Sequence, residues 1–201
     1  MTTTEQRRTG ADRLARTITE VLAPPHLVIG LLVVVGAASH RSAVIGALWG
    51  LAAALFVGVL PYAGVLLAVR RGNLSSRNIP ERVHRLAPIV LTAVSVAVGV
   101  TLLVLLGAPR DLVALVGAML AGLAATGLVT TVWKISMHTA VAAGASVILA
   151  LVFGPWLLLT LTLPIGVGWS RVHPHAHTLA QVIAGGVLGG VIAAAIFIPL
   201  R

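Results

Sequence analysis

The chain has 201 residues, of which 58% are apolar and only 9% are charged. A soluble domain carries about 25% charged residues, so this composition excludes an ordinary water-soluble globular protein. The formal charge of +9 predicts anionic partners such as lipid headgroups or phosphates. The absence of cysteine excludes disulfides, thiolate metal sites and a cysteine nucleophile.

The first 20 residues form a polar segment that contains four arginines. Apolar residues recur at helical spacing from Leu14 to Leu22, which predicts an amphipathic helix at the membrane interface. The segment lacks the small-residue cleavage site of a secretory signal. We therefore expect residues 1–20 to be an interfacial segment and residues 21–201 to form one membrane-embedded domain.

Six apolar runs follow, most of them long enough to span a bilayer, for which about 20 residues are needed. In chain order they cover residues 22–38, 43–69, 86–107, 112–133, 139–169 and 179–199. The fifth run has Gly154-Pro155 near its middle, and proline interrupts a helix, so this run predicts a hairpin of two shorter spans. We expect an all-α, polytopic integral membrane helical bundle of six or seven spans.

Lysine and arginine divide unequally between the two expected membrane faces. One face holds the N-terminal segment, loop 70–85, Lys134 and the loop 170–178, with 11 of the 14 Lys and Arg residues, and the other holds the remaining 3. Cytoplasmic loops are enriched in Lys and Arg. We therefore expect the first face to be cytoplasmic, in a bacterial-type plasma membrane. Basic residues confined to short loops do not favour a nucleic-acid partner.

Three polar clusters fall on this face, in loop 70–85, at residues 134–138 and at residues 170–177. They contain many hydrogen-bond donors and a single acid, Glu81. Guanidinium groups bind phosphate oxygens in pairs, and Lys134 adds a compact point charge. A neighbouring histidine can attack phosphorus or protonate a leaving oxygen. We expect a phosphate site without a metal or other cofactor, because cationic side chains neutralise the developing charge.

The third cluster carries a family resemblance. Ser170-Arg171, five further residues and His177 resemble the third motif of the type 2 phosphatidic acid phosphatase superfamily, which reads Ser-Arg, five residues, His, three residues, Asp. That superfamily includes lipid phosphate phosphatases, bacterial isoprenyl diphosphate phosphatases and vanadium haloperoxidases. The resemblance covers roughly residues 70–199.

The other two clusters resemble the first and second motifs of the same superfamily. Ser136-Met137-His138 is similar to the second motif, Pro-Ser-Gly-His. Arg82 and Arg85 are similar to a degenerate first motif, Lys, six residues, Arg-Pro. Together the three motifs favour a membrane phosphatase acting on a lipid phosphate or an isoprenyl diphosphate.

The resemblance implies a role for each matching residue. His177 would be the nucleophile that forms a phosphohistidine, and His138 would be the general acid for the leaving group. The phosphoryl oxygens would be held by Arg171, Arg82, Arg85 and Ser136, with Lys134 beside them. The chain departs from the pattern at position 181, where Gln181 replaces the aspartate that orients the nucleophile. Glutamine can still bond the imidazole but cannot balance an imidazolium.

Two other functions remain open at this stage. A site that binds a diphosphate but lacks an acid at position 181 could ionise an allylic diphosphate, as a terpene synthase-like prenyl diphosphate lyase does. The five acids of the chain form no magnesium-binding cluster, so such ionisation would depend on Arg, Lys and His. The second alternative is a catalytically degenerate homologue that binds phospholipids. His173 and His175 are expected to be loop histidines rather than zinc ligands.

Overall fold

The computed structural model describes residues 9–70 and 83–201, without the side chains of residues 65, 68, 69 and 83–89. Every regular element in these two ranges is a helix, which confirms the all-α class for the described residues. The elements are α1 (Gly10–Val21), α2 (Pro24–Ala38), α3 (Ala43–Ala54), the π-helix η1 (Leu55–Val59), α4 (Leu60–Arg70), α5 (Val83–Leu105), α6 (Arg110–Val132), α7 (Met137–Phe153), the 3₁₀-helix η2 (Pro155–Leu161), α8 (Thr162–Val172) and α9 (Leu179–Leu200).

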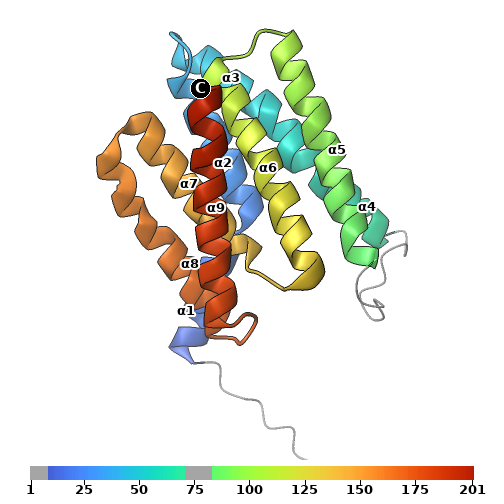
Figure 1. The fold of residues 1–201 in the computed structure, drawn as a ribbon, viewed down its shortest axis with the longest axis vertical. Coiled ribbons are helices and arrows are strands. Elements are labelled where there is room, and N and C mark those ends of the chain that lie inside the picture. Colours follow the sequence, from blue (N-terminus) through green and yellow to red (C-terminus); the bar gives the residue numbers. More distant parts are fainter. Residues whose placement is uncertain (1–8, 71–82) are drawn as a thin grey trace, which may run out of the picture.

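The helices form an elongated bundle in which α9 runs from one end to the other (Figure 1). Helix α1, the junction between α6 and α7 and the loop between α8 and α9 lie at the lower end of the view. The connections from α2 to α3 and from α5 to α6, with the C-terminus, lie at the upper end. The connections are therefore divided between the two ends of the bundle, as expected if successive apolar runs cross it in alternating directions.

Several helices are long and apolar enough to cross a membrane. Within the described residues, three meet this criterion by length and composition, at Ala43–Gly64, Arg110–Val132 and Leu179–Leu200. Helices α1 and α2 would count as a fourth if this pair, bent by 46°, forms one broken span. The predicted number of six or seven spans is not confirmed. Large apolar side chains such as Val44 and Leu128 are exposed on the outside of the bundle, as a lipid-facing surface requires.

The break predicted at the middle of the fifth apolar run is present, and the chain reverses direction there. Helix α7 ends at Gly154, whose φ of 113° is accessible to glycine but strained for other residues. Pro155 then starts η2, and the chain returns through α8 toward the end where α7 began. The loop after α8 is thereby brought back to the start of α7.

Helices α7 and α9 run parallel and pack with their backbones in close contact. A Cβ atom added to Gly185 would lie 2.5 Å from the carbonyl oxygen of Ser136, and one added to Gly189 would overlap the carbonyl of Ala140. These contacts are separated by one helical turn on each helix, so the two helices are in register from their first turns. Only glycine permits this approach, and it brings both N-termini to the same end of the bundle.

Candidate functional site

Three chain segments meet at the lower end of the bundle in Figure 1: the junction before α7, the end of α8 with its following loop, and the first turn of α9. Lys134 Nζ donates a hydrogen bond of 2.9 Å to the carbonyl of Ala176. The backbone N–H of Ser136 donates one of 3.1 Å to the carbonyl of Gln181. These two bonds tie the second and third polar clusters of the sequence to each other.

The imidazole of His177 has its orientation and tautomer set by Gln181. The Gln181 side-chain oxygen accepts from the backbone N–H of Thr178 at 3.2 Å, so this atom is an acceptor. His177 Nδ1 lies 3.3 Å from the same oxygen and must therefore be the protonated nitrogen. Nε2 is left with its lone pair, which is the state that a nucleophile or base requires.

Arg171 supplies a partly buried cation to the cluster. It lies in the last turn of α8, where a positive charge is favoured by the helix dipole. Its Nε is buried and has no hydrogen-bond partner in the structure, while its backbone carbonyl accepts from the N–H of His177 at 3.1 Å. A buried guanidinium N–H without a partner is unfavourable, and an anionic ligand would satisfy it.

His138 and Ser136 occupy the start of α7. His138 is half-buried in the first turn of α7, within electrostatic range of Arg171 and His177. Ser136 is fully buried and is the N-cap of the helix: its hydroxyl accepts from the N–H of Thr139 at 3.4 Å and bonds the Thr139 hydroxyl at 2.9 Å. The Ser136 side chain thus completes the helix end, and the role in phosphate binding assigned to it from the sequence stays a prediction.

A polar depression of about 410 Å³ opens over this cluster. Its lining includes Lys134, His175, His177 and Gln181, with Val172, Ala176 and Thr178. The N-terminal ends of both α7 and α9 lie at this end of the bundle, and unpaired N–H groups of helix N-termini attract anions. The depression is therefore lined or flanked by positive charge from several sources.

The pKa of His177 is lowered from its usual value. Partial burial of the ring has the largest effect, and the positive charge of Lys134 adds to it; Arg171 acts in the same direction. The hydrogen bond to Gln181 opposes this shift by favouring the protonated form. His177 is therefore neutral over a wider range of pH than a free histidine, with Nε2 available for bonding.

Two contacts that the sequence did not predict connect α1 to the site. The hydroxyl of Thr19 donates to the hydroxyl of Ser170 at 3.0 Å, so Ser170 is buried against α1 and does not line the depression. His173 Nε2 lies 2.9 Å from a carboxylate oxygen of Asp12. These pairs join residues 151 and 161 positions apart in the chain, and no local sequence signal could have identified them.

The cap of α9 was also missed, although a sequence signal for it exists. Thr178 and Gln181 form a capping box, in which each side chain bonds the backbone N–H of the other residue. Thr followed three residues later by Gln before an apolar run is the pattern that marks such a helix start. Gln181 thereby has two roles, as a capping residue and as the partner of His177.

The structure brings six of the predicted site residues together: Lys134, Ser136, His138, Arg171, His177 and Gln181. Arg82 lies outside the described residues. Arg85 belongs to α5, but its side chain is among those that are not described. Helix α5 packs against α6, η1 and α4, and its first residues lie toward the same end of the bundle as the cluster (Figure 1).

No protein-family model, curated protein or solved structure matches this chain. Two cationic side chains, a half-buried imidazole and a neutral imidazole with a fixed tautomer form an arrangement suited to an anion such as a phosphate.

Proposed function

We propose that this chain is an integral membrane phosphatase that acts without a metal on a lipid phosphate or an isoprenyl diphosphate. The single observation that carries the proposal is the Gln181 contact, which leaves His177 Nε2 unprotonated beside Lys134 and Arg171. The resemblance to the type 2 phosphatidic acid phosphatase motifs agrees with it. The proposed protein has six or seven spans, with α7 and the η2–α8 segment as short spans.

In the proposed reaction, His177 Nε2 attacks phosphorus and the bond from phosphorus to the leaving oxygen breaks. His138 donates a proton to that oxygen, which departs as the alcohol of a lipid monophosphate or as the prenyl monophosphate of a diphosphate whose terminal phosphorus is attacked. Arg171 and Lys134 neutralise charge on the phosphoryl oxygens. Water then attacks the phosphohistidine, with His138 taking its proton, and phosphate and free His177 are regenerated.

A second candidate function is favoured by the absence of a carboxylate at position 181. A phosphoryl group on His177 makes the ring cationic, and the neutral amide of Gln181 cannot balance that charge. If attack by His177 is disfavoured for this reason, the same cations could instead stabilise a departing diphosphate, and the prenyl cation would then cyclise or lose a proton. That reaction makes the protein a lyase of the terpene synthase type.

The test is to incubate the purified protein in detergent that contains a metal chelator. The substrate is either farnesyl diphosphate or phosphatidic acid. The phosphatase proposal predicts free phosphate with diacylglycerol, or with farnesyl monophosphate and, after a second hydrolysis, the linear alcohol, whereas the lyase predicts diphosphate and a hydrocarbon or cyclic alcohol. Both activities are expected to be lost in His177→Ala. The matched control is His175→Asn, because His175 lines the same depression and its φ of 56° is tolerated by asparagine. If neither substrate is turned over, the phosphatase and the lyase proposals are both contradicted, and the lipid-binding alternative remains.

We also propose that the site faces the cytoplasm, on the basis of the charge distribution. The chain has no native cysteine, so single cysteines can be introduced without background. His175→Cys lies at the site end of the bundle and His40→Cys at the opposite end, and both positions are exposed. A membrane-impermeant maleimide applied to intact cells is expected to label position 40 and not position 175. Labelling in the reverse pattern would refute this orientation.

A further inference from the structure

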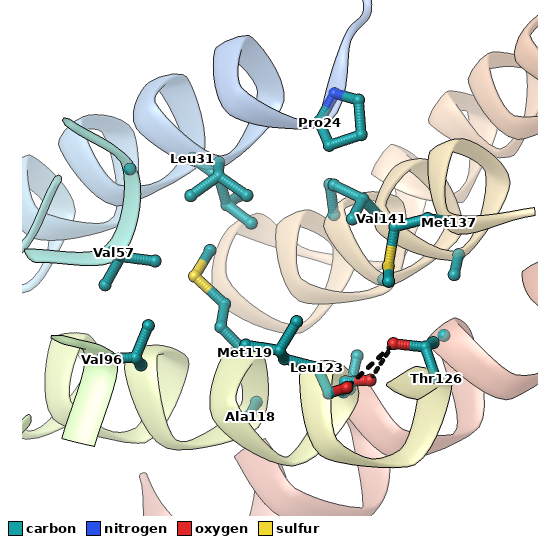
Figure 2. Close-up of a pocket in the computed structure, with 18 of the residues that line it drawn as sticks. Pro24, Leu31, Val57, Val96, Ala118, Met119, Leu123, Thr126, Met137 and Val141 are labelled. Carbon is teal, nitrogen blue, oxygen red and sulfur yellow. Dashed lines mark hydrogen bonds between the residues drawn. The ribbon is translucent and has the colours of Figure 1, made fainter. Parts of the chain in front are cut away.

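A second cavity, which is apolar and shares no lining residue with the polar depression, lies inside the bundle. Its volume is about 350 Å³. It is bordered by α2, α5, α6, α7, α9, η1 and the start of α4, and none of its lining residues is charged. Figure 2 shows Leu31, Val57 and Met119 pointing toward one another across it.

The few polar residues of this lining do not make it a polar site. Thr126 directs its hydroxyl back to its own helix, donating to the carbonyls of Gly122 and Leu123 at 2.7 and 3.2 Å (Figure 2). The remaining polar residues are Tyr62 and Thr92, among more than twenty that are otherwise apolar or glycine. An apolar cavity of this kind favours a hydrocarbon over water.

The cavity extends to the site end of the bundle. Met137 and Val141 line it from the first turns of α7 (Figure 2), and Met137 lies between Ser136 and His138 in the chain. The first turn of α7 therefore contributes Met137 to the cavity and His138 to the polar cluster. Pro24 and Pro25, at the start of α2, also line it at this end.

We propose that this cavity holds the single isoprenoid chain of the substrate. This proposal rests on the proposed function, because the isoprenoid chain belongs to a phosphorylated substrate whose phosphate is bound by the polar cluster. A cavity of about 150 Å³ binds one benzene ring, so 350 Å³ accommodates about 14 carbons. That volume suits one chain of about three prenyl units and is too small for the two acyl chains of phosphatidic acid. The occupant is therefore a short prenyl diphosphate.

The chain offers a glycine in the cavity lining at which an added Cβ atom meets no neighbour. Gly122 lines the cavity, and a Cβ atom added there meets no atom within 4 Å. Gly30 in α2 is the matched control: it is also in a helix, is exposed, meets no atom within 4 Å, and does not line the cavity. Gly122→Leu and Gly30→Leu make the same chemical change, one inside the cavity and one outside it.

The experiment uses a 15-carbon prenyl alcohol that carries a photoreactive diazirine and no phosphate, with the purified full-length protein in nanodiscs. Labelling is expected on peptides that contain Met119 or Leu123. Gly122→Leu is expected to reduce it at least tenfold, since excluding about two methylene groups from an apolar pocket weakens binding by about that factor. Gly30→Leu should label as the original protein does.

A size series keeps the test informative if Gly122→Leu is unstable. Met119→Ala enlarges the cavity and is expected to increase labelling by a 20-carbon probe relative to the 15-carbon probe. If labelling is spread over lipid-facing peptides, or is equal in all variants, the cavity does not bind the prenyl chain. Phosphatase activity is tested separately, by the release of phosphate. Selective labelling without any turnover of farnesyl diphosphate would instead support the pocket and refute the proposed function.

Discussion

His177 and Gln181 are joined by a hydrogen bond of 3.3 Å across the first turn of α9, and the acceptor oxygen also caps that helix. Helix capping and imidazole orientation therefore depend on one amide group. Because the amide oxygen already accepts from a backbone N–H, it cannot rotate to present its nitrogen to His177 without breaking the cap. The tautomer of His177 is fixed by helix formation.

Replacing Gln181 by Asp is expected to raise the rate of phosphate release from farnesyl diphosphate by about tenfold or more, because a carboxylate balances the cationic phosphohistidine. Aspartate can also accept the N-cap bond. Gln181→Leu is the contrasting variant: it loses the bond to His177, worth about 1 kcal/mol, and about 1 kcal/mol of helix capping. An unchanged or lower rate in Gln181→Asp would contradict the role of His177 as nucleophile.

Arg171→Met is expected to abolish anion binding without reducing the stability of the ligand-free protein. The Nε of Arg171 has no partner to lose, and methionine fills similar space. Thermal unfolding with and without pyrophosphate measures both effects; at 100 times the dissociation constant a ligand stabilises by about 2.7 kcal/mol. Arg110→Met at the opposite end of the bundle, where Nε bonds the carbonyl of Leu200, should retain this stabilisation. Retained stabilisation in Arg171→Met would exclude Arg171 from the site.

Lys134→Met is expected to move the acidic limb of the pH–rate profile to higher pH. The positive charge of Lys134 disfavours the imidazolium and so contributes to the lowered pKa of His177. Removing it raises the pKa, and since the protonated ring cannot attack phosphorus, activity is then lost at a higher pH on acidification. Titration of the His177 ring by NMR measures the shift without substrate. Arg16→Met, on exposed α1, should leave the titration unchanged.

Gly185→Ala is expected to destabilise the protein by about 1–3 kcal/mol, because its new Cβ would lie 2.5 Å from the Ser136 carbonyl oxygen. It should also reduce anion binding, since α7 and α9 can no longer start side by side. Gly186→Ala is the control, with its nearest neighbour, a methyl group of Thr139, at 3.4 Å. Equal stability of the two variants, by thermal unfolding in detergent, would refute the close packing of α7 on α9.

The helical class and the hairpin at Gly154 could be predicted because both follow from local composition: long apolar runs require helices in a membrane, and a Gly-Pro pair interrupts one. The π-helical turn η1 was not predicted. Pro61 follows it closely and has no N–H to donate to residue 57, and a π turn is one way to accommodate such a loss. The run therefore stays helical where the proline alone would have predicted a break.

The grouping of Lys134, Arg171 and His177 followed from the alternation of spans, which places their loops at one end. The finer geometry did not follow. The sequence did not predict that the Ser136 hydroxyl is buried and caps α7, and its role in phosphate binding stays a prediction. The contact of Thr19 with Ser170 depends on how α1 docks against α8, and such docking is decided by packing over the whole bundle.

The glycine contacts between α7 and α9 have a consequence for the biogenesis of the protein. Lys134 and His138 enter the membrane region before Arg171, and His177 and Gln181 emerge from the ribosome after all of them. The imidazole acquires its fixed tautomer only when α9 coils and docks its glycines on the α7 backbone. A nascent chain that has inserted only as far as α8 thus displays basic residues at the membrane surface, where they attract anionic headgroups, but lacks the oriented imidazole of His177. The hydrogen bond between His177 and Gln181 therefore depends on the docking of α9.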